Sequence, residues 1–249
     1  MSPKISVITV CFNCVSDIEK TILSVLNQDY HNIEYIIIDG GSSDGTLEVI
    51  KRYQGKISYW VSEPDRGIYD AMNKAIDIAT GEWLNFMNAG DVFVDKKTLS
   101  SVFNLNIPSN KKIIYSDFCG VKGGKTKIYK CSIEKGDIIH QATLYKKELH
   151  TVYGRYVLTD KIIISDYLFF CSIPYSFFMK IDIPIAIYDL SGISSGKWCF
   201  YQKLCADVIY QRISIKYLIC RVLLDPIVSL IPLFVKDYLK RQVGSLLYQ

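Results

Sequence analysis

The 249-residue chain has no run of about 20 uncharged apolar residues, which a membrane-spanning helix needs. Its first residues, MSPKISVITV, lack the basic segment, apolar core and cleavage site of a secretory signal peptide, so we expect none. No concentrated run of Lys and Arg occurs, and the formal net charge is only +4. We therefore expect a cytoplasmic protein that does not bind nucleic acid.

Common phosphate and metal signatures are also missing. The sequence contains no GxxxxGK[ST] motif, and no GxGxxG motif follows its first predicted strand. Both absences argue against a P-loop enzyme and a dinucleotide-dependent dehydrogenase. The eight cysteines form no pair of CxxC motifs and no CxxC followed by HxxxH, so a zinc site is unsupported. Without a signal peptide, reduced thiols are the expected state.

Short apolar runs alternate with amphipathic segments over the first 90 residues, and apolar residues make up 49% of the chain. The runs predict strands, and the segments between them predict helices. The predicted strands are Lys4–Val10, Ile33–Asp39, Ile57–Ser62 and Glu82–Met87. The predicted helices are Ser16–Asn27, capped by Ser16 or Asp17, a second from Asp44 to Tyr53, and Ile68–Ala79. This alternation indicates parallel βαβ units and an α/β fold.

The rhythm changes after about residue 110. Strands are expected at Ile113–Phe118, Lys125–Cys131, Phe177–Ile181 and Ile185–Tyr188, within a mixed α+β segment. From Lys197 onward the pattern is helical and strongly apolar, and Pro226 and Pro232 should kink or split it. We therefore divide the chain into residues 1–110, 111–195 and 196–249.

Polar residues follow the four predicted strands of the first segment. Asn13 follows the first strand, Asp39 ends the second, Asp65 follows the third, and Asp91 follows the fourth in NAGD. Ligands of an open parallel sheet bind beyond the carboxyl ends of its strands. Any one of these residues could be an ordinary turn residue. Together, however, the acids would repel one another, which suggests that a divalent cation and a nucleotide join them.

Four segments, ISVITVCFN, IIIDGGSSDGT, SEPDRGIYDAMNKAIDIATGEW and LNFMNAGD, resemble the inverting family 2 glycosyltransferases of the GT-A fold. The branch found in bacterial polysaccharide biosynthesis (O-antigen, capsule or exopolysaccharide) is the most similar. The resemblance is specific over about the first 95 residues and looser beyond, in HQATLYKKEL, ISDY and IAIYDLSGIS. It implies a Rossmann-like, mostly parallel sheet flanked by helices.

The resemblance also implies roles for individual residues. Asp91 would bind magnesium or manganese, and Asp166 would be the catalytic base, with Asp160 and Asp117 as alternatives. His140 and Gln141 could line the acceptor side. The nucleotide sugar would be bound by Val10, Asn13, Asp39, Asp65, Arg66 and Asn88. For Arg66, a helix-capping or surface ion-pair role is an equal alternative.

The implied activity is metal-dependent transfer of a hexose from a nucleotide diphosphate sugar to a saccharide hydroxyl, with inversion. Residues 1–110 would bind the donor and residues 111–195 an acceptor, which we expect to be polyprenyl-linked. The helices of residues 196–249 could pack on the core or lie at the inner face of the membrane. Two other functions stay open. One is a non-catalytic sugar-nucleotide-binding protein, and the other is a thiol redox protein built on the CxxC of Cys11 and Cys14.

Overall fold

The computed structural model describes residues 2–190 and 197–230, with side chains as far as residue 224. The chain packs as two compact units, residues 1–202 and residues 203–249, which are described separately. The segments 1–110 and 111–195 both lie within the first unit. The element bounds in this unit follow in chain order.

The first segment alternates strands and helices as the apolar pattern predicts. Its elements are β1 (Ile5–Cys11), α1 (Ile18–Leu26), β2 (Ile33–Asp39), α2 (Thr46–Tyr53), η1 (Gln54–Lys56), β3 (Tyr59–Ser62), α3 (Ile68–Ile78), β4 (Trp83–Phe86), β5 (Val92–Phe93) and α4 (Thr98–Phe103).

The second segment is mixed α+β, as expected. Its elements are β6 (Ile113–Ser116), β7 (Phe118–Lys122), β8 (Lys125–Tyr129), η2 (His140–Ala142), β9 (Thr143–Lys146), α5 (Leu149–Tyr153), α6 (Ser165–Cys171), η3 (Tyr175–Phe177), β10 (Phe178–Ile181) and β11 (Ala186–Asp189).

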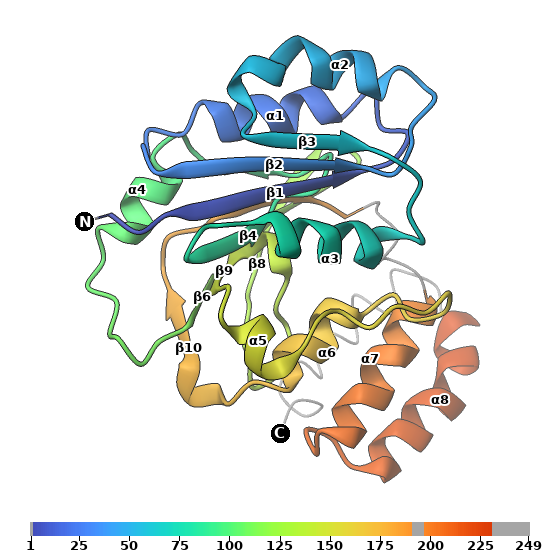
Figure 1. Ribbon diagram of the computed structural model, residues 1–249. Coiled ribbons are helices and arrows are strands. Elements are labelled where there is room, and N and C mark those ends of the chain that lie inside the picture. The colour runs from blue at the N-terminus through green and yellow to red at the C-terminus, as the bar shows by residue number, and fades with distance from the viewer. Residues whose placement is uncertain (1, 191–196, 231–249) are drawn as a thin grey trace. The chain divides into compact units, whose positions relative to one another are not determined.

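The main sheet has the strand order β10-β6-β9-β4-β1-β2-β3. All neighbouring pairs are parallel except those of β9, which runs antiparallel to both β4 and β6. Helices α1 and α2 lie on one side of β1, β2 and β3, and α3 lies on the other (Figure 1). Covered faces explain why all seven residues of β1 are buried. The strands of the second segment therefore extend the sheet that the first segment begins.

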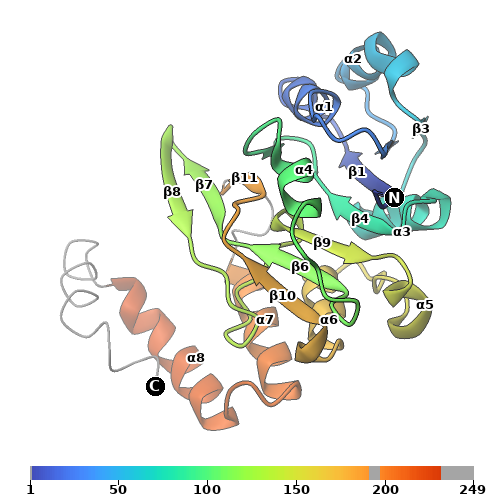
Figure 2. The same ribbon diagram turned by 90° about the vertical axis from the view of Figure 1, so that its left-hand side faces the viewer.

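A smaller sheet with the order β5-β11-β7-β8 joins the two segments. In it β11 pairs antiparallel with β5 and parallel with β7, and β7 and β8 form an antiparallel hairpin. Figure 2 shows this hairpin beside β11. Since β5 directly follows the NAGD turn, this sheet brings the end of β11 to that turn.

Helix α1 shows how the sequence pattern becomes packing. Ile18, Ile22 and Val25 recur at helical spacing and are buried, as predicted. The predicted cap is wrong, because Asp17 occupies the N-cap position without making a side-chain cap hydrogen bond. Its carboxylate instead accepts hydrogen bonds from Ser16 Oγ (2.7 Å) and Lys20 Nζ (2.6 Å). A nearby ammonium and hydroxyl therefore compete successfully with the backbone donors.

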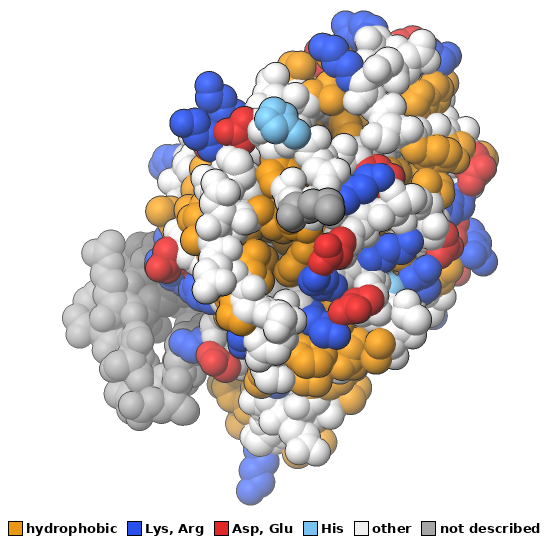
Figure 3. Space-filling model, turned by 60° about the vertical axis from the view of Figure 1, so that its left-hand side comes forward, with side chains coloured by type: hydrophobic (Ala, Val, Ile, Leu, Met, Phe, Trp, Pro, Cys, Tyr) orange, Lys and Arg blue, Asp and Glu red, His pale blue; other side chains and the backbone are white. Residues whose placement is uncertain are grey.

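The helical end of the chain contains α7 (Lys197–Ile209) and α8 (Ile215–Leu230). Helix α8 continues through Pro226, so the expected split at this residue is wrong, while Pro232 lies outside the described residues. Among the residues that the structure describes, no helix is long and apolar enough to cross a membrane. On the face shown in Figure 3, basic and acidic side chains are interspersed.

Candidate active site

The carboxyl ends of neighbouring strands meet at one edge of the main sheet. Cys11 at the end of β1 pairs with Asp39 at the end of β2, and Asp39 pairs with Ser62 at the end of β3. On the other side of β1, just beyond β4, Ala89 donates its backbone N–H to the carbonyl oxygen of Val10 (3.3 Å). We call this region the strand-end edge, formed by the loops 12–17, 40–45, 63–67 and 88–91.

Asp39 organises the loop after β2 from within. Its carboxylate accepts hydrogen bonds from the backbone N–H groups of Gly41 (3.2 Å) and Ser42 (2.9 Å). It also accepts from the hydroxyls of Ser42 (2.5 Å) and Ser62 (2.6 Å) and from the thiol of Cys11 (3.4 Å). Burial alone would raise its pKa, but these donors outweigh burial and lower it. Because Asp39 is completely buried, the surface at this point is formed by the loop that it holds.

Asn13 joins the loops after β1 and β2. Its backbone N–H donates to Ser42 Oγ (2.7 Å), and its side-chain oxygen accepts from the backbone N–H of Ser43 (2.9 Å). The residue has φ of 47°, in the left-handed region that Asn tolerates better than most side chains. This conformation turns the chain sharply after β1 and leaves Asn13 exposed at the strand-end edge.

Asp65 lies over Gly40. A Cβ atom at Gly40 would lie 2.5 Å from Asp65 Oδ2, so only glycine leaves space for the carboxylate. The other oxygen, Oδ1, accepts from the backbone N–H of Gly67 (2.8 Å). The ring of Phe12, which is 62% exposed, approaches the same point. A carboxylate beside an exposed ring suits a nucleobase or ribose hydroxyls.

Arg66 forms the surface ion pair that the sequence left as an alternative. Its guanidinium contacts Asp70 Oδ1 at 3.1 Å, and its side chain is 76% exposed. The second oxygen of Asp70 accepts from the Arg66 backbone N–H (3.1 Å). This pair secures the start of α3. Among the described residues, it shares no side-chain hydrogen bond with the other predicted site residues.

The NAGD turn after β4 is anchored on α1. Gly90 has φ of +102°, a conformation that favours glycine. The hydroxyl of Thr21 accepts from the backbone N–H of Gly90 (3.0 Å) and donates to the carbonyl oxygen of Asp91 (2.8 Å). Within the turn, Asp91 donates its N–H to the carbonyl oxygen of Asn88 (3.0 Å). The buried strand thus ends in a rigid turn.

Asp91, the single acid of this turn, is only 4% exposed. Its Oδ2 accepts from the amide of Gln141 (2.9 Å), and its Oδ1 accepts from the backbone N–H of Asp189 (3.2 Å) at the end of β11. Burial outweighs these hydrogen bonds and raises the pKa of Asp91 to about 6. The carboxylate therefore ties together β4, η2 and β11.

Asn88, His140 and Asp166 form a connected row. The Asn88 amide donates to His140 Nε2 (2.9 Å), and His140 Nδ1 contacts Asp166 Oδ2 at 2.7 Å. The hydroxyl of Tyr69, from the first turn of α3, donates to Asp166 Oδ1 (2.7 Å). The structure thus brings together three predicted site residues that are separated by up to 78 positions in the sequence.

The surroundings of Asp166 differ from those of the two alternative bases. Burial alone would raise its pKa, but hydrogen bonds from His140 and Tyr69 outweigh burial and lower it. Asp117 is bound by Lys130 (2.7 Å) and Lys180 (2.8 Å), and its pKa is lowered to about 2. Asp160 is exposed. Of the three acids, Asp166 is the one linked to the NAGD turn.

The oxygens of the NAGD turn fit a divalent ion that completes its coordination from ligand and water. Among the described residues, each Asp91 oxygen accepts one hydrogen bond and keeps a further lone pair, as metal-binding carboxylates commonly do. Asn88 Oδ1 is buried and has no hydrogen-bond donor among the described residues. In that part of the chain, no three His, Cys, Asp or Glu side chains converge to hold a metal by themselves.

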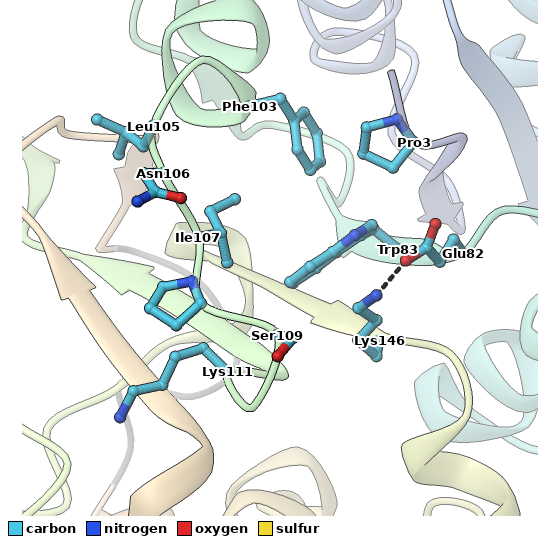
Figure 4. Close-up of a pocket in the computed structure, with 11 residues that line it drawn as sticks. Pro3, Glu82, Trp83, Phe103, Leu105, Asn106, Ile107, Ser109, Lys111 and Lys146 are labelled. Atoms are coloured by element: carbon cyan, nitrogen blue, oxygen red, sulfur yellow. Dashed lines mark hydrogen bonds and ion pairs between the residues drawn. The ribbon is translucent and has the colours of Figure 1, made fainter. Parts of the chain in front are cut away.

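A separate cleft lies at the opposite edge of the sheet, where β1 and β4 begin. Figure 4 shows Pro3, Trp83 and Phe103 along it, with Lys146 paired to Glu82. Ligands of parallel sheets bind at the carboxyl ends of the strands, which lie at the other edge. The candidate active site is therefore the strand-end edge.

The model of "Glycosyl transferase family 2" matches residues 6–168, which include β1 and the NAGD turn as well as His140 and Asp166. The chain belongs to glycosyl transferase family 2. The match begins one residue inside β1 and ends within α6, so it spans the whole strand-end edge.

Relatives of this family 2 chain match only part of their own length. An uncharacterized glycosyltransferase of Mycobacterium tuberculosis is 43% identical over 93 residues, which cover 37% of this chain and 36% of the relative. A PGL/p-HBAD biosynthesis glycosyltransferase of Mycobacterium bovis is 28% identical over 172 residues, covering 65% of this chain and 66% of the relative. The chain thus spans about a third to two thirds of these relatives.

Two solved structures share the fold. Staphylococcus aureus TarS, in complex with UDP-GlcNAc, has a TM-score of 0.65 and 19% identity, over 75% of this chain and 58% of that one. Mannosyltransferase PcManGT from Pyrobaculum calidifontis, in complex with GDP-Man and Mn²⁺, has a TM-score of 0.64 and 18% identity, over 100% and 82% of the chains. The predicted α/β fold of GT-A glycosyltransferases is confirmed.

The thiol pair of the alternative redox function lies at the end of β1. Interaction with the neighbouring Cys11 thiol lowers the pKa of Cys14, although burial acts in the opposite direction. Cys11 also contacts Asp39, and its thiol is buried. This segment belongs to the family 2 fold, and the Cys11 thiol contacts the carboxylate that holds the loop after β2.

Several contacts of this family 2 site were not predicted from the sequence. Tyr69 binds Asp166, Thr21 anchors the NAGD turn, and the Asp189 backbone binds Asp91. Tyr69 lies in the quoted motif SEPDRGIYDAMNK, which could have drawn attention to it. The other two come from unrelated segments of the chain and carry no local signal.

Proposed function

We propose that this chain transfers a sugar from a nucleotide diphosphate sugar to a hydroxyl of a saccharide or glycolipid acceptor, with inversion. The observation that carries the proposal is the row Asn88–His140–Asp166, which holds a carboxylate at the strand-end edge of a family 2 fold. The two structural neighbours hold UDP-GlcNAc and GDP-Man, which supports a nucleoside diphosphate sugar as donor.

The donor would occupy the loops that Asn13 and Asp39 organise. Asp65, beside Phe12 and over Gly40, offers a carboxylate oxygen to the base or ribose hydroxyls. The carbonyl oxygen of Val10 accepts a hydrogen bond from the NAGD turn. The end of β1, where the nucleotide would bind, therefore lies beside Asn88 at the end of β4. Arg66 lies near the same edge and would meet the donor only by leaving Asp70.

Asp166 would act as general base toward the acceptor. Its carboxylate takes the proton of the acceptor hydroxyl as the oxygen bonds to the anomeric carbon. The bond from that carbon to the diphosphate oxygen breaks, and the diphosphate leaves with the electron pair. Attack from the opposite face inverts the anomeric carbon, and no covalent enzyme intermediate is needed. Tyr69 and His140 hold the carboxylate in one orientation during this step.

Asp91 and Asn88 would hold magnesium or manganese, which offsets the charge of the leaving diphosphate when bound. The presence of Mn²⁺ with PcManGT supports this choice of ion. Gln141 would then orient Asp91 rather than line the acceptor side, because its amide donates to Asp91 Oδ2.

A membrane-linked acceptor agrees with the relative named for PGL/p-HBAD biosynthesis and with the exposed apolar side chains of α8. We infer that the chain helps to build a bacterial surface polysaccharide or glycolipid in the cytoplasm, at the inner face of the membrane. Its acceptor would be a polyprenyl-linked saccharide. A non-catalytic sugar-nucleotide-binding protein is the second candidate, since NAGD carries one acid and that acid is buried.

The test is a screen of nucleotide sugars for binding, hydrolysis and transfer, with Mg²⁺, Mn²⁺ or a chelator present. We expect turnover of one donor by the wild-type chain. Asp166→Asn should lower kcat by about 10²- to 10⁴-fold, the usual effect of losing a general base, while donor Kd changes little. Asp160→Asn is the matched control, because Asp160 is exposed, and it should behave as wild type.

One result would decide against this function, and a second would decide against Asp166 as its base. Binding of a nucleotide sugar without turnover, across many acceptors and both metals, would favour the non-catalytic alternative. Nearly normal kcat in Asp166→Asn together with a large loss in Asp160→Asn or Asp117→Asn would move the base to one of those acids.

A further inference from the structure

His140 is enclosed between Asn88 and Asp166. Its side chain is 12% exposed, both ring nitrogens have partners, and the ring meets Phe86 edge-on with centroids 6.4 Å apart. A residue that hydrogen-bonds an acceptor sugar needs a free donor or acceptor atom. The geometry leaves His140 no free ring nitrogen for such a hydrogen bond.

The direction of the hydrogen bonds follows from the chemistry of the carboxylate. An ionised carboxylate only accepts, so His140 Nδ1 must be the donor to Asp166, and Nε2, which lies 2.9 Å from the Asn88 amide nitrogen, accepts from it in the neutral ring. Nδ1 then carries the ring proton and donates to Asp166 Oδ2 (2.7 Å). The Asp166 carboxylate requires this ring tautomer, and the hydrogen bond from Asn88 favours it as well.

The carboxylate of Asp166 is consequently fixed at both oxygens. Tyr69 donates to Oδ1, and His140 donates to Oδ2. Tyr69 belongs to α3 and His140 to η2, so two separate elements set the plane of the carboxylate. A base oriented in this way has fewer orientations to lose before proton transfer.

We propose that His140 is a positioning residue for Asp166, and that Asn88 fixes the ring of His140 so that the NAGD turn and the base are held in one geometry. This rests on the proposed transferase function. It gives Asn88 a role that an acid at the same position cannot fill, because a carboxylate has no N–H to donate to Nε2. The NAGD turn therefore serves the base as well as the donor.

Three substitutions separate the two nitrogens of His140. His140→Asn puts an amide N–H near the position of Nδ1, His140→Gln puts one near the position of Nε2, and His140→Ala removes both. The measurements are kcat, donor KM and donor Kd, using the nucleotide sugar that the wild-type chain turns over. Thermal unfolding of each variant shows whether it is folded. His31→Asn is the matched control, since His31 is exposed.

We expect His140→Ala and His140→Gln to lower kcat about 10- to 100-fold, as loss of an orienting partner does, with donor Kd within about twofold of wild type. His140→Asn should recover most of the lost kcat. In an Asp166→Asn background, His140→Ala should lower kcat no further. Equal kcat in His140→Asn and His140→Gln, or a loss confined to donor Kd, would overturn the proposal.

A spectroscopic measurement tests the geometry without turnover. Long-range ¹H–¹⁵N correlation of the His140 ring in the full chain should show the proton on Nδ1, and Asn88→Ala should disturb that preference. A proton found only on Nε2 would overturn the assignment. If the wild-type chain turns over no donor, the proposed function fails, while the ring spectrum still decides how His140 holds Asp166.

Discussion

At Gly40, the absence of a side chain lets one loop reach another. The Asp65 carboxylate occupies the space that a Cβ atom would fill, 2.5 Å from Oδ2. The conflict would be with the end of a flexible side chain and not with backbone. A methyl group at this position should therefore displace Asp65 while leaving the sheet intact.

Gly40→Ala should thus weaken donor binding without unfolding the protein. We expect donor KM and Kd to rise about tenfold, the effect of losing one hydrogen bond to a charged group, and kcat to change little. Isothermal titration with the donor and a thermal melt would measure both effects. Asp65→Ala should give the same loss, and the double variant should lose no more than either. A full loss in Gly40→Ala but none in Asp65→Ala would contradict this explanation.

Asp91 shows how burial changes the meaning of a motif residue. From the sequence, it was a lone acid at a metal motif. In the structure, the Gln141 amide donates a hydrogen bond to one of its oxygens, and the Asp189 backbone N–H donates to the other. Its metal role therefore remains a proposal, and its role in joining three elements is observed.

At the scale of elements, strand order explains why distant residues meet. β9 lies between β4 and β6, and η2 directly precedes β9, so His140 arrives beside the end of β4. α6 carries Asp166 in its first turn. The sequence pattern predicted most strands, but it did not predict that ISDY begins a helix, because this segment was assigned only to a mixed stretch.

Helix α8 exposes a group of apolar side chains whose membrane role can be tested. Ile215, Ile219 and Leu223, spaced four residues apart, are 62%, 51% and 67% exposed. Burying each in a membrane interface would be worth about 1.5–3 kcal/mol. The change Ile219→Glu with Leu223→Glu should therefore lower binding to phosphatidylglycerol-containing vesicles by at least about a hundredfold.

Sedimentation of the full chain with such vesicles measures this binding. Val152→Glu is the matched control, because Val152 is 70% exposed on α5 and lies in the other unit. It should sediment as wild type does. Equal sedimentation of the wild type and the α8 double variant would rule out this helix as the membrane contact.

At the scale of the whole molecule, burial shifts the pKa values of two groups in opposite directions. Burial raises the pKa of Asp91 from 3.8 to about 6, so the folded chain binds its proton more tightly than the unfolded chain. Burial lowers the pKa of His150 from 6.5 to about 4, so the unfolded chain binds that proton more tightly. Each shift corresponds to about 3 kcal/mol of unfolding free energy.

As pH falls from 6.5 to 4, protonation of Asp91 therefore stabilises the fold, while the need to protonate His150 destabilises it. The two contributions nearly cancel in the wild-type chain. Asp91→Asn should make stability fall more steeply with acidification, and His150→Gln should make it fall less or rise. Urea unfolding between about pH 4.5 and pH 7.5 measures these slopes, because this interval covers most of the titration of both groups. Parallel slopes in all three proteins would contradict the assignment.

The sequence by itself determined the alternation of strands and helices and the polar strand ends, since apolar periodicity and turn residues are local properties. It also indicated the family, which the match over residues 6–168 confirmed. Only the tertiary structure decided which of these side chains are available and which are partnered. Asp39 and Asp91 are buried, and His140 forms hydrogen bonds with both Asn88 and Asp166. Burial and partner choice depend on strands that are adjacent in space and remote in sequence, so no local pattern could contain them.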